Sequence, residues 1–337
     1  MKVIDMHCDT IGGMYMWSKK ESHIDKNEMN IDLEKMEKGD YMAQCFAMFV
    51  PFNVENPFEV CMGMIDRFYT EMEAHPDRIG IARNYDDIIK NNEEGKMSAI
   101  LTIEEGGVTK GNLAYLRDFY RLGVRMITLT WNFENGVGFP NFKRPENKDE
   151  KPNFKNPNTK DGLTPYGIEM VKEMNRLGII IDVSHLSDAG FYDVLKYTTG
   201  PFVASHSNAR AVCNHCRNLT DDMIRELAKR GGVTGINYAA DFLREVPDGE
   251  DNFSYIADMV KHIKHIAEVG GIDCVGLGSD FDGMDKSDMP VGISGVRDIR
   301  NIEEKLITRG FSKKEVYNIM GGNYIRVLKE NLNWFYW

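Results

Sequence analysis

The chain has 337 residues, 42% hydrophobic and 28% charged, and its 52 Asp and Glu residues outnumber its 41 Lys and Arg residues, giving a net charge of −11. This composition is typical of a globular protein with a large core and argues against disorder. The acidic balance argues against nonspecific nucleic-acid binding, which needs a basic face, and it excludes no class of enzyme.

Short apolar runs rich in β-branched residues alternate along the chain with amphipathic stretches. The runs predict strands at residues 3–9, 43–50, 97–104, 125–131, 178–185, 201–206, 232–238 and 274–281. The amphipathic stretches predict helices at residues 57–73, 112–122, 164–177, 188–197, 220–230, 254–269, 301–308 and 312–331. Ser312 and Glu315 form a capping box that marks the start of the last of these helices.

Eight strands in alternation with helices predict an α/β fold, a single (β/α)8 barrel that covers residues 1–337. Runs such as 179–181 do not alternate polar with apolar residues, which is typical of parallel strands buried on both faces. A usual domain size of roughly 150 residues would instead suggest two domains. A doubly wound open sheet is the alternative fold, but no Gly-x-Gly-x-x-Gly follows an early strand.

The segment 132–160 is rich in Asn, Pro, Lys and Glu and has no helical periodicity. We predict a long loop at about residues 132–163, after the fourth strand and above the catalytic end of the barrel. A loop of this length is either functional or a plain solvated surface, and both readings stay open.

The ends of the chain and its six cysteines suggest a cytoplasmic protein. We expect no signal peptide and no C-terminal lipid-anchor signal, and no apolar run reaches the roughly 18 residues of a transmembrane helix. Cys213 and Cys216 form a C-x-x-C around His215, but no second ligand pair accompanies them, so we expect neither a zinc site nor a redox role there. The aromatic segment 331–337 could pack on the barrel or form a dimer contact.

Histidines and acids fall at the ends of several predicted strands. The residues at these ends are His7, Asp9, Glu104, His185, His206 and Asp280. In a barrel the carboxyl ends of the strands converge on one face, and His-x-Asp places both side chains on the same side of a strand. Three histidines with several carboxylates form a site for a borderline cation such as Zn²⁺.

Each of these residues alone could be structural, and the other histidines show how common that is. We assign no role to His23, His75 and His215, or to His262 and His265, which are expected on one exposed helix face. A carboxylate that bridges two cations would create a dinuclear site for metal-assisted hydrolysis. Sequence motifs of serine hydrolases, His-Glu-x-x-His zinc proteases and P-loop enzymes are absent.

Six motifs along the chain resemble those of one known family. They are Asp5-Met6-His7-Cys8-Asp9-Thr10, Glu104-Glu105-Gly106-Gly107, Leu122-Gly123-Val124-Arg125, Asp182-Val183-Ser184-His185, Ser205-His206-Ser207 with Arg217-Asn218 downstream, and Gly278-Ser279-Asp280-Phe281-Asp282-Gly283. From residue 4 to about residue 323 the chain is similar to the membrane (renal) dipeptidase-type zinc dipeptidases of peptidase family M19. The resemblance implies a (β/α)8 barrel that holds two zinc ions.

The resemblance also implies the ligands of both ions. One zinc would be bound by His7, Asp9 and Glu104. The other would be bound by Glu104, His185 and His206, so that Glu104 bridges the two ions. Glu105 competes for the bridging role, but the spacing to Leu122-Gly123 selects Glu104.

Three further residues receive roles from the same resemblance. Arg217 would hold the C-terminal carboxylate of the substrate, for which a guanidinium is suited. Asp280 would contact the substrate and move a proton from the nucleophilic water to the leaving amine. Trp131 departs from the family, in which many members carry a substrate-binding histidine. An indole can only donate, so the substrate range is in question.

The sequence therefore predicts a cytoplasmic, zinc-dependent dipeptidase that acts through a bridging hydroxide, with acceptance of C-terminal D-residues left open. The expected partners are a small dipeptide and a second copy of the chain, with neither nucleic acid nor membrane. A cyclic amidase or deaminase is one alternative, although many of these begin with His-x-His and carry a metal-bridging lysine after the fourth strand. A non-catalytic dipeptidase-like binding protein is the other alternative, and Trp131 is its best support.

Overall fold

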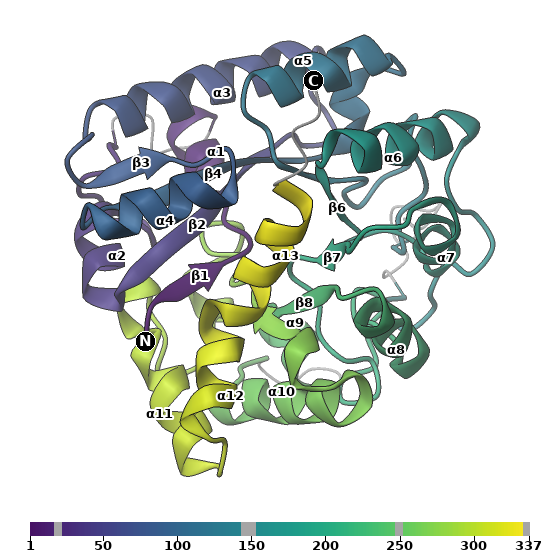
Figure 1. Ribbon diagram of the computed structural model, residues 1–337. Helices are drawn as coiled ribbons and strands as arrows, with labels where there is room; N and C mark the ends of the chain where they lie inside the picture. The colour runs from purple at the N-terminus through teal and green to yellow at the C-terminus, as the bar shows by residue number, and fades with distance from the viewer. Residues whose placement is uncertain (17–21, 143–152, 247–251, 333–337) are drawn as a thin grey trace.

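The computed structural model describes residues 1–16, 22–142, 153–246 and 252–332, and within it eight parallel strands close into a barrel (Figure 1). The barrel strands are β1 (Val3–Asp5), β2 (Tyr41–Phe49), β4 (Met97–Glu104), β5 (Met126–Thr128), β6 (Ile180–Asp182), β7 (Val203–Ala204), β8 (Val233–Ile236) and β9 (Val275–Leu277). Strand β2 pairs with both β1 and β4, and β1 also pairs with β9, so the ring is complete. The predicted (β/α)8 barrel is confirmed.

A further short strand, β3 (Ile79–Ile81), lies outside this ring. It pairs with the first residues of β4, where Ile79 is opposite Met97. Strand β5 pairs with the last residues of β4, where Thr102 is opposite Met126. The two short strands therefore share one edge of β4, and the sequence prediction missed β3.

Helices cover the outside of the barrel. They are α1 (Thr10–Tyr15), α2 (Leu33–Gly39), α3 (Pro57–Glu73), α4 (Tyr85–Glu93), α5 (Leu113–Arg121), α6 (Pro165–Leu177), α7 (Asp188–Tyr197), α8 (Asp221–Lys229), α9 (Ala240–Leu243), α10 (Ile256–Gly270) and α11 (Arg300–Thr308). Short 3₁₀ turns lie at η1 (Gly106–Thr109), η2 (Ile272–Cys274), η3 (Lys286–Asp288) and η4 (Val296–Asp298). Helices α3 and α7 have the predicted bounds. The prediction missed four helices, α1, α2, α4 and α9. Helices α1, α2 and α9 are short, and α4 buries only one side chain, that of Ile88.

The last predicted helix, residues 312–331, is interrupted. It forms α12 (Lys313–Tyr317), a π-helical turn η5 (Asn318–Gly322) and α13 (Asn323–Leu332). The backbone leaves the helical conformation at Gly321, where a Cβ atom would lie 3.0 Å from the backbone nitrogen of Ile4. The break therefore lets the chain approach β1 closely.

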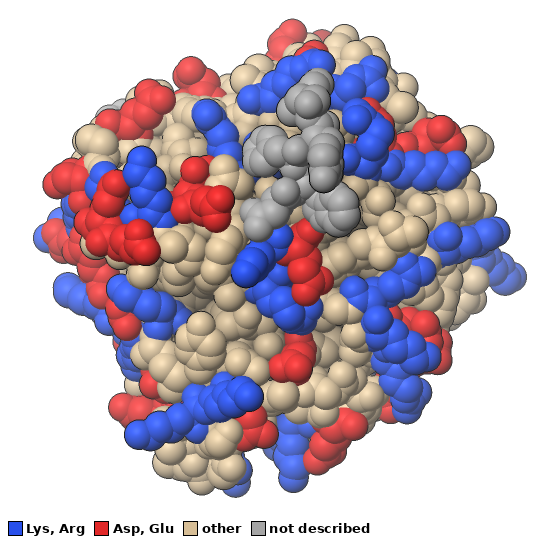
Figure 2. Space-filling view, in the orientation of Figure 1, with Lys and Arg blue, Asp and Glu red and all other residues tan. Residues whose placement is uncertain are grey.

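Helix α13 closes the N-terminal end of the barrel, and in Figure 1 it lies across the ring of strands. Tyr324, Val327 and Leu328 are fully buried on this helix. They pack with buried side chains of the strands, which include Ile4, Ile100, Met126, Ile180, Val203 and Val233. The opposite, C-terminal end is left for the functional site. On the face shown in Figure 2, acidic and basic side chains are interspersed and form no surface of a single sign.

The loop between β5 and α6 follows the prediction in the part that the structure describes, residues 132–142 and 153–163, where neither a helix nor a strand forms. An isolated bridge from Gly138 to Leu163 joins the two ends of the loop, and another from Pro140 to Leu186 holds it to the segment after β6. Residues 143–152 and the predicted aromatic contact at 333–337 lie outside the described residues.

The cysteines and His262 are buried in the barrel. All six cysteines are buried and form no disulfide, and none of the described helices is long and apolar enough to cross a membrane. The prediction for His262 was wrong, because this side chain is fully buried. Its Nδ1 accepts from the backbone nitrogen of Ala209 at 3.1 Å, and its Nε2 lies 3.0 Å from the carbonyl oxygen of Leu243.

Candidate metal centre

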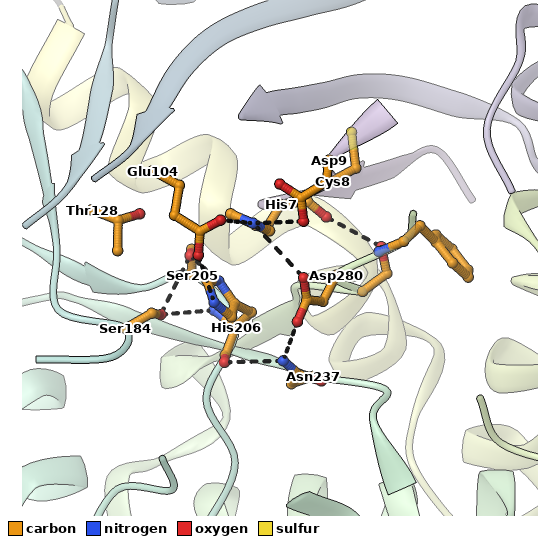
Figure 3. Close-up of polar contacts among 12 residues, drawn as sticks. His7, Cys8, Asp9, Glu104, Thr128, Ser184, Ser205, His206, Asn237 and Asp280 are labelled. Carbon is orange, nitrogen blue, oxygen red and sulfur yellow. Dashed lines mark hydrogen bonds and ion pairs between the residues drawn. The ribbon is translucent and has the colours of Figure 1, made fainter. Parts of the chain in front are cut away.

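The histidines and acids predicted at the strand ends meet at the C-terminal end of the barrel, and Figure 3 labels all of them except His185, whose Nε2 lies 3.0 Å from Glu104. Glu104 lies in the middle of the group and is 3% exposed. Its Oε2 is 3.3 Å from Nε2 of His7, and its Oε1 is 3.0 Å from Nε2 of His185 and 3.6 Å from Nε2 of His206. Asp9 approaches from the other side, with Oδ2 at 3.7 Å from Nε2 of His7.

These side chains form two groups with the geometry of a metal site, and the groups share one carboxylate. His7, Asp9 and Glu104 form the first group. Glu104, His185 and His206 form the second, and within each group the potential ligand atoms lie within 4.8 Å of one another. Glu104 is therefore a potential metal ligand that both groups share.

Hydrogen bonds fix the tautomers of the two histidines in the second group. Nδ1 of His185 is 2.8 Å from Oδ1 of Asn132, an oxygen that can only accept, so this ring nitrogen carries the proton. The hydroxyl of Ser205 donates to Asp182 at 2.6 Å, so it accepts from Nδ1 of His206 at 2.7 Å. Both Nε2 atoms are left with bare lone pairs.

The two bare Nε2 atoms of His185 and His206 face each other at 2.9 Å, beside the carboxylate of Glu104. Neither atom has a proton to offer the other, so the contact is unfavourable without a cation between the groups. In the first group, both ring nitrogens of His7 and Oδ1 of Asp9 are buried without any hydrogen-bond partner. Imidazole and carboxylate ligands with unused lone pairs fit a borderline divalent metal ion.

The pKa directions of His185, His206 and Glu104 agree with this donor set. Those of His7 and Asp9 do not, because Glu104 raises the pKa of His7 well above its usual value against the effect of burial, and burial raises the pKa of Asp9, so a metal ion would have to displace their protons. Burial lowers the pKa of His185 to about 4 and, with the nearby charge of His7, brings the pKa of His206 well below its usual value. Burial alone would raise the pKa of Glu104, but His7 and His185 hold it well below its usual value. Neutral imidazoles and ionised carboxylates are the forms that bind metal ions.

Two buried carboxylates hold the strand ends in place. Asp5 accepts from the backbone nitrogens of His7 at 3.0 Å and Ser279 at 3.1 Å, and so ties the end of β1 to the end of β9. Asp182 does the same for β6 and β7. It accepts from the backbone nitrogens of Ser184 and Ser205 at 3.0 and 2.8 Å, and from the hydroxyls of Ser205 and Thr128 at 2.6 and 2.5 Å.

Strained backbone is concentrated at the same strand ends. His185, Asp280 and Glu105 have φ angles of 69°, 62° and 119°, in the left-handed region that favours glycine. Such conformations cost roughly 1–3 kcal/mol each and persist where the surroundings fix them. The backbone bonds made by the two buried carboxylates supply part of that fixing.

Glu105 takes a separate position from Glu104. Its carboxylate accepts from the backbone nitrogens of Gly107 at 2.8 Å and Trp131 at 3.0 Å, and from the side-chain amide of Asn135. Burial raises the pKa of Glu105 to about 7. Glu105 therefore holds the start of the β5–α6 loop, while Glu104 faces the histidines.

Asp280 lies at the rim of the centre, with Oδ1 at 3.9 Å from Nε2 of His7 and a side chain that is 18% exposed. Asn237 donates to its Oδ2 at 2.9 Å (Figure 3). Gly283 lies against this acid and Asp9. A Cβ atom at position 283 would be 2.2 Å from Oδ2 of Asp9 and 2.6 Å from Oδ1 of Asp280. The sequence alone assigned no role to Asn237 or Gly283.

Arg217 is buried beside the second group of ligands. Its Nη1 and Nη2 make only long hydrogen bonds, to Oγ of Ser207 at 3.3 Å and the carbonyl oxygen of His206 at 3.4 Å, and its Nε has no partner. No carboxylate of the described residues lies within 4.0 Å of it. A buried guanidinium without a counterion is costly, which fits a site for an anionic group.

Trp131 contributes a wall to the site. Its ring centre lies 5.1 Å from that of Phe49, 6.2 Å from that of Phe133 and 6.1 Å from that of His185. Beyond it a cavity of about 910 Å³ opens at the catalytic end of the barrel, with Phe52, Asn132 and Phe133 in its lining. The wall is aromatic where many relatives were expected to carry a histidine.

Known proteins similar to this chain include several peptidases. A family model described as membrane dipeptidase (peptidase family M19) matches residues 1–333. An uncharacterized dipeptidase of Schizosaccharomyces pombe is 33% identical over 320 residues, 89% of this chain and 71% of that protein. Dipeptidase tcpJ of Claviceps purpurea is 31% identical over 315 residues, 89% of this chain and 69% of that protein.

A solved structure is similar over its whole length. The crystal structure of a metallo peptidase from Rhodobacter sphaeroides, liganded with a phosphinate mimic of the dipeptide L-Ala-D-Ala, is 26% identical to this chain. The alignment has a TM-score of 0.88 and covers 98% of this chain and 99% of that one. The sequence and structure comparisons therefore agree on one family.

Proposed function

Since the chain belongs to the membrane dipeptidase family, peptidase family M19, and is a dipeptide-hydrolysing enzyme, we propose that it works with two zinc ions. The family and the clustered ligands indicate a metal cofactor. We propose further that the metal is zinc, that each chain binds two ions, and that the clustered residues are the ligands. These ligands are His7, Asp9 and Glu104 for one ion, and Glu104, His185 and His206 for the other.

The observation that carries this proposal is the pair of bare Nε2 atoms of His185 and His206, which face each other at 2.9 Å beside Glu104. When bound, two zinc ions would supply a bridging hydroxide as nucleophile and would polarise the peptide carbonyl of the substrate. The shared carboxylate of Glu104 keeps the two ligand groups at a fixed separation.

Asp280 is proposed as the proton carrier of the reaction. It lies 3.9 Å from His7 and is partly open to the space where a substrate would bind, so it can receive the proton of the nucleophile and deliver it to the leaving amine. Asn237 orients it by donating to Oδ2 and leaves Oδ1 directed toward the ligands.

Arg217 is proposed to bind the C-terminal carboxylate of the dipeptide. The buried guanidinium has no counterion among the described residues, and a carboxylate would satisfy it with two charge-assisted hydrogen bonds. This contact would restrict substrates to those with a carboxylate next to the scissile bond. C-terminal D-residues are proposed among the substrates, because the Rhodobacter sphaeroides relative is liganded with a mimic of L-Ala-D-Ala.

Trp131 is proposed to shape the substrate site by packing rather than by proton transfer. Its indole N–H can only donate, and its ring already packs on Phe49 and Phe133. A bulky wall of this kind would select among the side chains of dipeptides.

Metal analysis combined with turnover tests the proposal. The chelated and zinc-reloaded protein is expected to hold about two zinc ions per chain and to hydrolyse L-Ala-L-Ala and L-Ala-D-Ala. His185→Ala is expected to lose one ion and nearly all turnover. The matched control His23→Ala, at a histidine whose side chain is 66% exposed, should change neither. One ion per active chain, or full activity of His185→Ala, would refute the dinuclear proposal.

We also propose that the enzyme works in the cytoplasm as a homodimer with no nucleic-acid partner. Six buried and unpaired cysteines fit a reducing compartment. Light scattering of the purified protein tests the dimer, and a monomer at micromolar concentration would refute it.

A further inference from the structure

The guanidinium of Arg217 has few contacts of its own to hold it. Its two hydrogen bonds are long, at 3.3 and 3.4 Å, and neither partner is charged. The guanidinium also lies over the ring of Phe242 on α9, whose centre is 5.5 Å from the guanidinium carbon. The position of Arg217 therefore depends on what holds Phe242 and the backbone around residue 217.

A column of four rings leads from Phe242 to the β5–α6 loop. The ring centres of Phe242 and His215 are 4.6 Å apart, and those of His215 and Phe154 are 4.9 Å apart with an interplanar angle of only 20°. Phe154 in turn stacks on Phe142 at 5.2 Å and 23°. We call these four residues, Phe142, Phe154, His215 and Phe242, the ring column.

The backbone next to Arg217 is tied to the same loop. Nδ1 of His215 accepts from the backbone nitrogen of Arg217 at 3.1 Å. The backbone nitrogen of Cys216 donates to the carbonyl oxygen of Phe154 at 2.7 Å, and the carbonyl oxygen of Cys216 accepts from Asn141 at 2.7 Å. Both ends of the peptide unit before Arg217 are thus fixed by the β5–α6 loop or by a ring of the column.

His215 is suited to this position as a neutral ring. Burial and the cations of Arg217 and Arg210 lower its pKa to about 3, so Nδ1 keeps a lone pair for the backbone nitrogen of Arg217 at ordinary pH. Phe154 is 41% exposed, so its ring lies at the surface end of the column. It stacks on His215 on one side and on Phe142 on the other, and so links the β5–α6 loop to the ring that accepts from the backbone of Arg217.

We propose that Phe154 and His215 are positioning residues that set Arg217, so that the β5–α6 loop controls affinity for the substrate's C-terminal carboxylate. The inference rests on the proposed role of Arg217 as the carboxylate-binding residue. It gives a function to the C-x-x-C segment around His215, which the sequence left without one. It also gives a function to the described part of the long loop.

Steady-state kinetics of zinc-loaded variants tests the proposal. Phe154→Ala and His215→Ala are expected to raise KM for L-Ala-L-Ala by about tenfold while kcat stays within about twofold, because the contact with the carboxylate binds the ground state and the transition state equally. Phe154→Tyr keeps the ring and should retain the original KM. The matched control Phe253→Ala removes another phenylalanine, 40% exposed and outside the ring column, and should have no effect.

Two further measurements separate this effect from a general loosening of the site. Hydrolysis of L-Ala-L-Ala amide, which lacks the carboxylate, should be equal in the original protein and in both alanine variants. In an Arg217→Ala background, adding Phe154→Ala should raise KM no further, since the two changes act through one contact.

The outcomes distinguish the inference from its premise. If Arg217→Ala raises KM strongly but Phe154→Ala and His215→Ala do not, the positioning role is wrong and the role of Arg217 stands. A loss of kcat, an equal effect on the amide, or full additivity with Arg217→Ala would also overturn the positioning role. If Arg217→Ala leaves KM unchanged, the proposed carboxylate site itself fails.

Discussion

Gly283→Ala would insert one methyl group between the two carboxylates that flank the metal centre. The Cβ atom would lie 2.2 Å from Oδ2 of Asp9 and 2.6 Å from Oδ1 of Asp280. Relaxed carbon–oxygen contacts are about 3.3 Å or longer, so both carboxylates or the backbone at residue 283 must shift, by about 1 Å at Asp9 and by somewhat less at Asp280. Asp280 is partly exposed and can move toward solvent, whereas Asp9 is buried and its shift would disturb the first ligand group.

The size of the effect follows from what Asp280 is proposed to do. A misplacement of about 1 Å in a reacting group can cost roughly 10²-fold in rate. We therefore expect kcat of Gly283→Ala to fall by about two orders of magnitude. Because the clash with Asp9 is the closer one, zinc affinity should also fall, by roughly 10- to 100-fold, as when the support of a ligand is removed.

The assay compares kcat, zinc content and thermal stability with those of Gly136→Ala. A Cβ atom at Gly136 would meet nothing within 4 Å, so this control carries the same chemical change into open space. Gly136→Ala should keep its kcat within about twofold of the original value. A Gly283→Ala enzyme with the original kcat and two zinc ions would refute the reasoning, because the acids could then not be held as the structure places them.

Three other perturbations have defined outcomes. Asp182→Asn should lower zinc affinity by roughly 10- to 100-fold, because Ser205 could then donate to Nδ1 of His206 and move the proton of that ring to Nε2. Isothermal titration measures the zinc affinity, and an unchanged value would contradict this mechanism. Removal of metal with a chelator should abolish turnover and lower the melting temperature, because the bare Nε2 atoms of His185 and His206 then face each other. Added zinc should restore both properties. A chelated enzyme that stays active would rule out the metal mechanism. Trp131→His should shift kcat/KM toward small dipeptides by about tenfold relative to those with aromatic side chains; a panel of dipeptides measures the ratio, and an unchanged ratio would remove Trp131 from the substrate site.

The barrel was predictable because its signals are local. Apolar runs and helical periodicity are properties of neighbouring residues, and helices α3 and α7 begin and end where that periodicity does. Helix α4 has a mostly polar sequence with one buried residue, Ile88, so it carries almost no such signal. The break at Gly321 depends on the approach to Ile4, more than 300 residues away in the chain, and no local pattern could predict it.

The same distinction applies to the site. The convergence of His7, Glu104, His185 and His206 follows from their place at strand ends once a barrel is assumed. Their ligand roles remain proposals. The burial of other histidines was harder to predict. The sequence pattern predicts an exposed helix face at His262, but α9 and the segment around Ala209 pack over this side chain in the structure.

The supporting contacts could not be found from the sequence at all. Asp182 accepts from two strands and from Thr128, and this depends on which strand ends are neighbours in the ring. The separation of Glu104 from Glu105 is likewise a matter of three dimensions. The φ angle of 119° at Glu105 directs its side chain toward the β5–α6 loop. The sequence of two adjacent glutamates does not indicate this backbone conformation.

The position of α13 has a consequence for folding of the enzyme during its synthesis on the ribosome. Synthesis runs from the N-terminus at about 5–20 residues per second, so the strands emerge well before the helix that covers their starting ends. Until Tyr324 and Val327 arrive, the apolar floor formed by residues such as Ile4 and Met126 faces water. Late in translation the nascent barrel thus exposes an apolar surface at its N-terminal end, of the kind that chaperones bind. A stop codon near position 321 would remove α13 and leave this surface exposed.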